Sequence, residues 1–196
     1  MKSYAKILIL FVVFLFISIL LGGITAYWFQ FISCKKTAEK LDYLPAIKPV
    51  RFLVYGSSSG TVSCHFSLYD RNSREIASIE RSWNGGALYV DFATVSFNKT
   101  VLQFPLRIYS DYSKGGVSLK RYYLIDGICR IYSQFGEEPD EIKKIRRLCV
   151  FAFTASKLPF YKKYTSIKTI RLTSVPMGRI CAIYISSDGN ITILPD

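Results

Sequence analysis

Hydrophobic side chains form one unbroken run near the start of the chain. Residues 7–34 contain no charged side chain, and lysines flank them on both sides. About 20 apolar residues in a helix cross a hydrocarbon core of about 30 Å. Aromatic residues crowd the end of the run from Tyr27 onward, and such rings favour the headgroup layer. The pattern predicts a transmembrane helix over residues 7–29. Its course is marked by Ile7, Phe16, Leu21 and Trp28.

Two alternatives to a retained membrane helix stay open. Lys2 and Lys6 before an apolar run also begin a secretory signal peptide, but such a peptide has an apolar region of only about 7–15 residues. The segment Phe31–Cys34 resembles a relaxed bacterial lipobox, at which a signal is cut and Cys34 receives lipid. All three interpretations place the chain at a membrane.

Charges near the two ends of the run bear on the orientation. More Lys and Arg residues follow the run than precede it, and the positive-inside rule taken literally places the following domain in the cytoplasm. The rule weakens for long domains, and so short a segment before the span commonly stays cytoplasmic, as in a signal anchor. We therefore expect a single-pass protein whose domain is extracytoplasmic.

The rest of the chain divides into a connector and one domain. Residues 1–6 form a short basic tail, and residues 30–49 form a charged connector that contains proline. Residues 50–196 have the length of a single domain, without internal repeats or a second apolar span.

Apolar and polar residues alternate over much of residues 50–109, as in half-buried strands. Turn residues separate these strands, and we expect Asn84–Gly86 to form a hairpin turn within an antiparallel meander. Pro105 predicts an edge strand or a bulge, because proline cannot donate to a ladder. The expected strands cover residues 51–55, 62–68, 76–83, 88–92 and 101–109.

The second half of the domain mixes strands with one helix. Glu138–Glu141 places a proline and acids at a helix start, and apolar residues then recur at helical spacing to Ala152. We expect that helix to pack on the sheet, which predicts an α+β fold. Further strands are expected over residues 117–123, 167–173, 179–186 and 190–194.

The charge balance points to an anionic partner. The chain has 26 Lys and Arg against 14 Asp and Glu, a formal net charge of +12. Beside a bilayer, basic residues are attracted to anionic lipid, and nucleic acid attracts them by the same physics. We expect the membrane surface, or another envelope protein, rather than nucleic acid. The candidate contact residues are Lys143, Lys144, Arg146, Arg147, Lys162 and Lys163.

The cysteines suit a structural role better than a metal site. No CxxC motif occurs, and the spacing fits no zinc pattern. We expect Cys64, Cys129, Cys149 and Cys181 to be buried thiols. In an oxidising compartment two disulfides with three alternative connectivities remain open.

Catalytic motifs are missing from the sequence. His65 is the one histidine, which excludes sites that need two imidazoles, and no phosphate-binding loop or cofactor motif is present. An anchored β-rich domain with one His, several Cys and many Arg is comparable to the sortase transpeptidases, but no Thr-Leu-x-Thr-Cys run precedes any cysteine. We expect a binding, scaffold or envelope-associated module. The alternatives are a membrane-tethered hydrolase or transferase with a Cys/His/Arg site, and a surface lipoprotein modified at Cys34.

Overall fold

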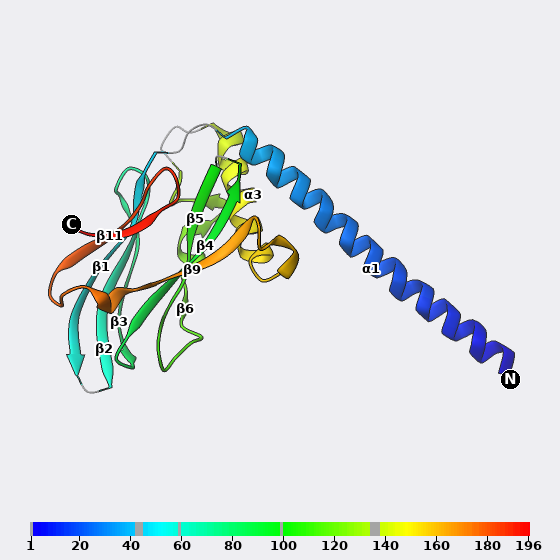
Figure 1. Ribbon diagram of the computed structural model, residues 1–196, viewed down its shortest axis with the longest axis horizontal. Coiled ribbons are helices and arrows are strands. Elements are labelled where there is room, and N and C mark those ends of the chain that lie inside the picture. The colour runs from blue at the N-terminus through cyan, green and yellow to red at the C-terminus, as the bar shows by residue number, and fades with distance from the viewer. Residues whose placement is uncertain (1, 42–44, 59, 99, 134–137) are drawn as a thin grey trace. The chain divides into compact units, whose positions relative to one another are not determined.

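The computed structural model describes residues 2–41, 45–58, 60–98, 100–133 and 138–196 (Figure 1). It divides into two compact units, Met1–Lys36 and Thr37–Asp196. The second unit contains the sheets and is called the β-rich unit below.

The first unit consists of the apolar part of α1 (Lys2–Glu39). This helix is long and apolar enough to cross a membrane, and its most apolar window contains no buried residue. Ile7, Phe16, Leu21 and Trp28 are all exposed, as side chains that face lipid are. The Thr25 hydroxyl donates to the carbonyl of Leu21, so this polar group is satisfied within the helix.

Helix α1 continues beyond the predicted span. Residues 30–39, assigned above to the charged connector, are helical, and the first strand starts at Ile47. The helix persists because this stretch has no proline or glycine, whereas Pro45 and Pro49 follow it. The apolar residues Leu41, Tyr43, Leu44 and Ile47 of the connector are predicted to dock onto the domain, and of these Tyr43 and Leu44 lie outside the described part of the chain.

The first sheet of the β-rich unit has five antiparallel strands in the order β11-β10-β1-β2-β3. Alternation places Phe52, Val54, Cys64 and Phe66 on its buried face. The strands are β1 (Ile47–Ser58), β2 (Thr61–Tyr69), β3 (Glu75–Asn84), β10 (Ile180–Ile185) and β11 (Ile191–Pro195).

The second sheet has four strands in the order β6-β5-β4-β9. Its register shifts between Asp91 and Phe92 of β4, where Pro105 of β5 becomes the partner of Phe92 and Leu106 is the extra residue. The bulge predicted from Pro105 is therefore confirmed. The strands are β4 (Leu88–Phe97), β5 (Thr100–Ser110), β6 (Val117–Ser118) and β9 (Thr165–Arg171).

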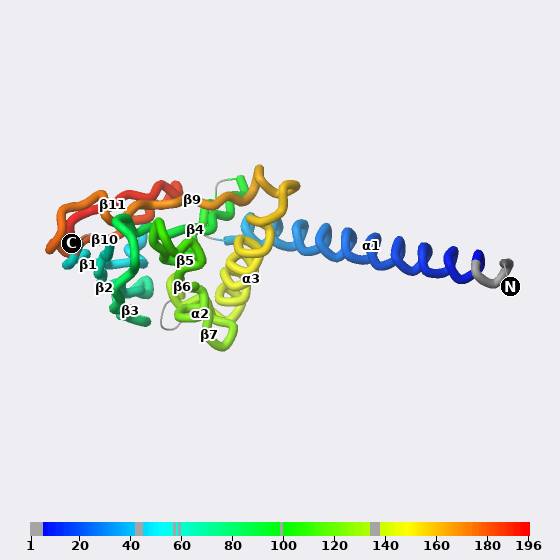
Figure 2. Tube along the Cα trace, turned by 90° about the horizontal axis from the view of Figure 1, so that it is seen from below, coloured from blue at the N-terminus to red at the C-terminus, as the bar shows by residue number. Residues whose placement is uncertain are grey.

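The two sheets and one helix form three layers (Figure 2). Strand β4 is buried on both faces, because the five-stranded sheet covers one face and helix α3 (Pro139–Ala155) covers part of the other. On the helix side, Phe97 contacts Phe151, and Phe104 contacts Phe153, with ring centroids 5.8 and 6.1 Å apart. The predicted α+β class is confirmed.

Short elements complete the β-rich unit. Helix α2 (Lys120–Tyr123) is followed by a two-stranded sheet of β7 (Leu124–Ile125) and β8 (Ile128–Cys129). Two 3-10 helices flank β9, η1 (Pro159–Tyr161) before it and η2 (Leu172–Ser174) after it.

Two expectations about the strands, one about pairing and one about extent, were wrong. Asn84–Gly86 does not close a hairpin, because β3 and β4 belong to different sheets. The turn instead passes between the layers, and Gly85 adopts φ +126° where an added Cβ would meet the Asp111 carboxylate. The strand expected over 117–123 ends at Ser118 and gives way to α2.

Candidate functional site

Two tyrosine hydroxyls form hydrogen bonds with backbone groups at the edge of β5, beside helix α3. The Tyr132 hydroxyl donates to the carbonyl of Gln103 at 2.9 Å and accepts from the N–H of Gln103 at 3.0 Å. The Tyr123 hydroxyl donates to the carbonyl of Pro105 at 2.7 Å. Proline has no N–H, so these contacts complete this part of the edge, while β6 pairs only with Arg107 and Ile108.

The same two tyrosines adjoin a pair of thiols. The Cys149 thiol, on α3, lies near both the Cys129 thiol and the Tyr123 hydroxyl. All four side chains are buried. Burial raises the pKa of Tyr123, Tyr132 and Cys149 above their ordinary values. These three groups are therefore protonated at neutral pH.

A buried carboxylate joins three strands of the four-stranded sheet. Asp91, which is 1% exposed, accepts from Arg107 Nε at 2.8 Å, the Tyr109 hydroxyl at 3.1 Å and the Thr169 hydroxyl at 2.6 Å. Burial is the main cause that raises the pKa of Tyr109. The arrangement pairs the buried charge and cross-links β4, β5 and β9, as a structural ion pair does.

His65 is separated from the cysteines. It lies on β2 with its side chain on the face opposite that of Cys64, and its Nε2 is 3.1 Å from the Ser67 hydroxyl and 3.3 Å from the Ser78 hydroxyl. Burial raises the pKa of Cys64 to about 12, so its thiol is a poor nucleophile at neutral pH. Among the described residues, the Cys/His/Arg site of the alternative hypothesis is not assembled.

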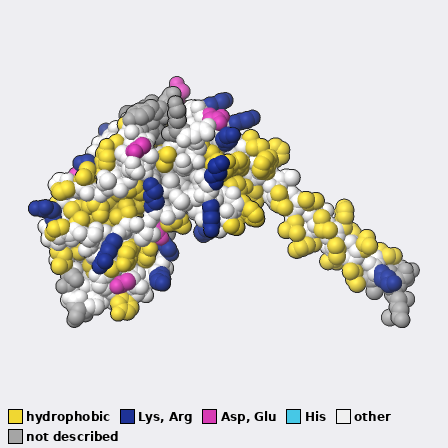
Figure 3. All heavy atoms as spheres, viewed as in Figure 1, with side chains coloured by type: hydrophobic (Ala, Val, Ile, Leu, Met, Phe, Trp, Pro, Cys, Tyr) yellow, Lys and Arg dark blue, Asp and Glu magenta, His cyan; other side chains and the backbone are white. Residues whose placement is uncertain are grey.

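The six predicted contact residues fall into two groups. Lys143, Lys144, Arg146 and Arg147 lie on α3, whereas Lys162 and Lys163 follow η1, beyond the C-terminal end of α3. All are exposed except Lys144, which is intermediate. Lys and Arg are scattered over the face of the β-rich unit that Figure 3 shows, whereas hydrophobic side chains line α1.

Some of these cations have partners within the β-rich unit. Lys144 Nζ lies 3.4 Å from a carboxylate oxygen of Asp140, and Arg147 donates to the Thr37 hydroxyl at 3.2 Å. The guanidinium of Arg146 lies against Gly127 in the β7–β8 turn. The chain enters the β-rich unit at Thr37, so Arg147 marks that entry point on α3.

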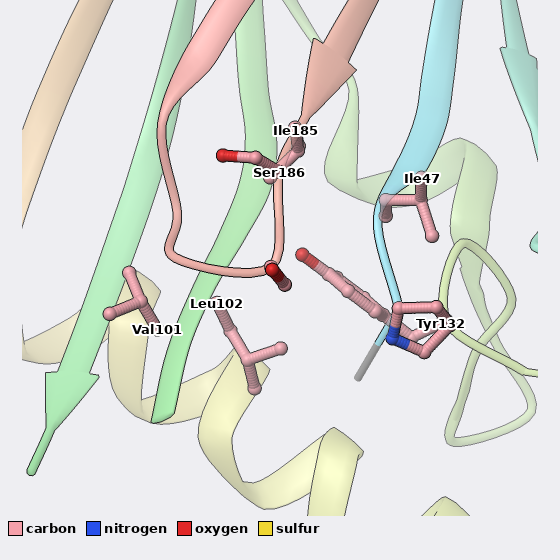
Figure 4. A pocket seen from close by; sticks show the side chains of 8 residues that line it. Ile47, Val101, Leu102, Tyr132, Ile185 and Ser186 are labelled. Atoms are coloured by element: carbon pink, nitrogen blue, oxygen red, sulfur yellow. The ribbon is translucent and has the colours of Figure 1, made fainter. Parts of the chain in front are cut away.

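Two cavities in the β-rich unit are candidate binding sites. The first has a volume of about 10 Å³, enough for about one water molecule. It lies between β1, β5 and β10, and Figure 4 labels Ile47, Val101, Leu102, Tyr132, Ile185 and Ser186 around it.

The second cavity is an open cleft of about 360 Å³ between the β2–β3 turn and β8. Asp70, Arg74, Glu75 and Arg130 supply charges of both signs. The Asp70 carboxylate already accepts from the backbone of Asn72 and Arg74 at 2.8 Å, which is how an aspartate closes a turn. The Asp70 carboxylate of this cleft is therefore already used within the turn.

No protein-family model, curated protein or solved structure matches this chain. Its function is therefore inferred from its own residues. Cys34 lies within α1, and its lipidation stays a prediction. In the described residues, no group of three or more His, Cys, Asp or Glu is placed to hold a metal ion.

The sequence did not reveal the tyrosine contacts or the Asp91 cluster. Tyr132 is far from Gln103 along the chain, and a tyrosine gives no pattern that names its partner. Asp91 left a weak signal, because it interrupts a strand in which Leu88, Val90, Phe92 and Val95 are all buried.

Proposed function

We propose that this chain is a single-pass membrane protein, held by α1 as a signal anchor, whose β-rich unit is an extracytoplasmic binding, scaffold or envelope-associated module. The observation that carries the proposal is the long apolar helix, whose apolar side chains are exposed rather than packed against protein. This helix is joined to a separately compact unit. A helix satisfies its own backbone hydrogen bonds in lipid, which is what a spanning segment needs. We propose the extracytoplasmic orientation because the positive-inside rule weakens for long domains such as the one that follows the span.

We propose anionic lipid headgroups as a contact of the β-rich unit. Lys143, Arg146 and Arg147 are exposed on α3, and Arg147 lies at the point where the chain enters the unit. Basic residues near an anionic surface gain about 1 kcal/mol each, and the gain fades within a Debye length. Attraction at this end would restrict how the unit moves above the bilayer.

Accessibility of an engineered cysteine tests the orientation. Tyr112 is 79% exposed, so Tyr112→Cys presents a reactive thiol, whereas the five native cysteines are buried. We expect a membrane-impermeant maleimide to label Tyr112→Cys in intact cells and to leave the native chain unlabelled. Labelling only after permeabilisation would show that the β-rich unit is cytoplasmic. Extraction of the chain by alkaline carbonate would contradict the membrane anchor itself.

Lysine acylation tests the lipid contact. The full chain is reconstituted in nanodiscs of phosphatidylcholine alone or mixed with phosphatidylserine, and acylation of each lysine is followed by mass spectrometry. We expect Lys143, Lys144, Lys162 and Lys163 to react several-fold more slowly in the anionic discs. The difference should vanish at about 1 M salt, where the Debye length falls to about 3 Å.

Lys114 supplies the internal control, because it is exposed in the loop between β5 and β6 and does not belong to the proposed surface. Equal acylation rates in the two kinds of disc would contradict the lipid contact. A decrease at Lys114 as large as that on α3 would contradict its assignment to these residues.

A further inference from the structure

Cys129 and Cys149 are neighbouring thiols in the β-rich unit. Cys129 ends β8 and Cys149 lies in the middle of α3, and these two elements pack together. Both residues are almost fully buried, with 2% and 0% exposure, and the Cys129 thiol is near enough to help burial raise the pKa of the Cys149 thiol. The fold thus brings together two thiols that lie on separate elements.

The other two cysteines of the unit cannot form a comparable pair. Cys64 is the β2 partner of Val54, and Cys181 is the β10 partner of Phe52, so the whole of β1 separates them. Neighbouring strands lie about 4.8 Å apart, which places the Cα atoms of Cys64 and Cys181 more than about 9 Å apart. A disulfide needs a Cα–Cα distance of at most about 7 Å. A second disulfide between Cys64 and Cys181, beside one between Cys129 and Cys149, is therefore excluded.

We propose that Cys129 and Cys149 are a disulfide-forming pair, oxidised during folding on the oxidising side of the membrane. The location of this step rests on the proposed extracytoplasmic orientation, whereas the choice of pair rests on the fold alone. The disulfide would fasten β8 to α3 over the edge of β5.

The chemistry is a thiol–disulfide exchange. The two thiols lose two protons and two electrons and form one S–S bond, while the disulfide of a dithiol oxidoreductase is reduced to two thiols. The nucleophile is a thiolate, and burial in the finished fold suppresses ionisation of Cys149. The bond therefore forms before α3 is fully packed.

Refolding of the purified full chain tests the pairing without reference to topology. The reduced, denatured chain is refolded in detergent with a glutathione redox buffer, alkylated, digested with trypsin and analysed by mass spectrometry. Trypsin places the two residues in different peptides, 122–130 and 148–157. We expect these peptides to be joined, with Cys64 and Cys181 alkylated once the chain is unfolded.

Single variants provide matched controls. For each protein, the midpoint of denaturant unfolding is compared between oxidising and reducing buffer, so that any cost of the substitution cancels. We expect oxidation to raise the midpoint in the native chain and in Cys64→Ala, but not in Cys129→Ala or Cys149→Ala. Free thiols at both positions after refolding, or a bond to Cys64 or Cys181 in similar yield, would overturn the pairing.

The redox state in cells tests the compartment. We expect the joined peptides in chains isolated after rapid alkylation of intact cells. A reduced pair in cells that label Tyr112→Cys from outside would overturn oxidation there while leaving the orientation intact. A reduced pair with Tyr112→Cys protected from outside would overturn both the orientation and the location of oxidation.

Discussion

The phenol of Tyr132 replaces a neighbouring strand at the edge of β5. A single hydroxyl bonds both the N–H and the carbonyl of Gln103, which is itself 0% exposed. Buried backbone groups without partners are costly, so the position depends on one oxygen atom.

Tyr132→Phe is expected to lower the free energy of unfolding by about 2–4 kcal/mol, because it leaves two buried backbone groups of Gln103 unsatisfied at about 1–3 kcal/mol each. The measurement is denaturant unfolding of the full chain in detergent, followed by the fluorescence of Trp83, which is buried. Tyr112→Phe is the matched control, since Tyr112 is 79% exposed, and should change stability by less than about 0.5 kcal/mol. Equal effects of the two substitutions would show that the hydroxyl bonds of Tyr132 do not matter.

At the scale of elements, the β5–β6 connection depends on two adjacent glycines with different roles. Gly116 has φ +58°, and an added Cβ would lie 2.2 Å from the carbonyl oxygen of Ile108. Apart from the residues on either side, a Cβ added to Gly115 would meet no other atom within 4 Å. One glycine is required by the backbone and the other is not.

Gly116→Ala should therefore destabilise the protein by more than about 1 kcal/mol, because the left-handed conformation and the contact with Ile108 both oppose a side chain. Gly115→Ala should stay within about 0.5 kcal/mol of the native chain. Thermal unfolding of the two variants in the same detergent checks the difference. A Gly116→Ala variant as stable as Gly115→Ala would contradict the geometry of this turn.

Prediction from sequence succeeded where a local pattern determines the structure. Alternation identified β1 to β5 and helical spacing identified the helix that follows Glu138, because burial on one face repeats every two or about 3.6 residues. The missing N–H of Pro105 indicated the bulge. It could not assign β3 and β4 to different sheets, since alternation is the same in either sheet. Contacts such as Tyr132 with Gln103 depend on the tertiary fold and leave no local signal.

At the scale of the whole molecule, the core contains weak acids whose protonated form is stabilised by burial. Burial raises the pKa of Cys64 from 9.0 to about 12, and the pKa values of Tyr123 and Tyr132 are also raised. A raised pKa favours the protonated form in the folded state. The resulting stability is fully present below the pKa of the unfolded chain and is lost as the pH rises toward the folded value.

The free energy of unfolding should therefore be level from about pH 7 to pH 8 and should fall above about pH 9. Cys64 alone contributes a slope of about 1.4 kcal/mol per pH unit between its unfolded and folded pKa. Denaturant titrations at several pH values measure the slope, and Cys64→Ala should make it shallower. Constant stability up to pH 11 would contradict burial of these acids.

The tyrosine contacts along β5 also bear on how the protein avoids association. An unpaired strand edge is a template on which another chain can add a strand, and proline at an edge blocks such addition. Pro105 and the two phenols occupy that edge of the four-stranded sheet. A partner that binds by strand addition would therefore find longer free edges at β9, β3 and β11 than at the two-residue β6.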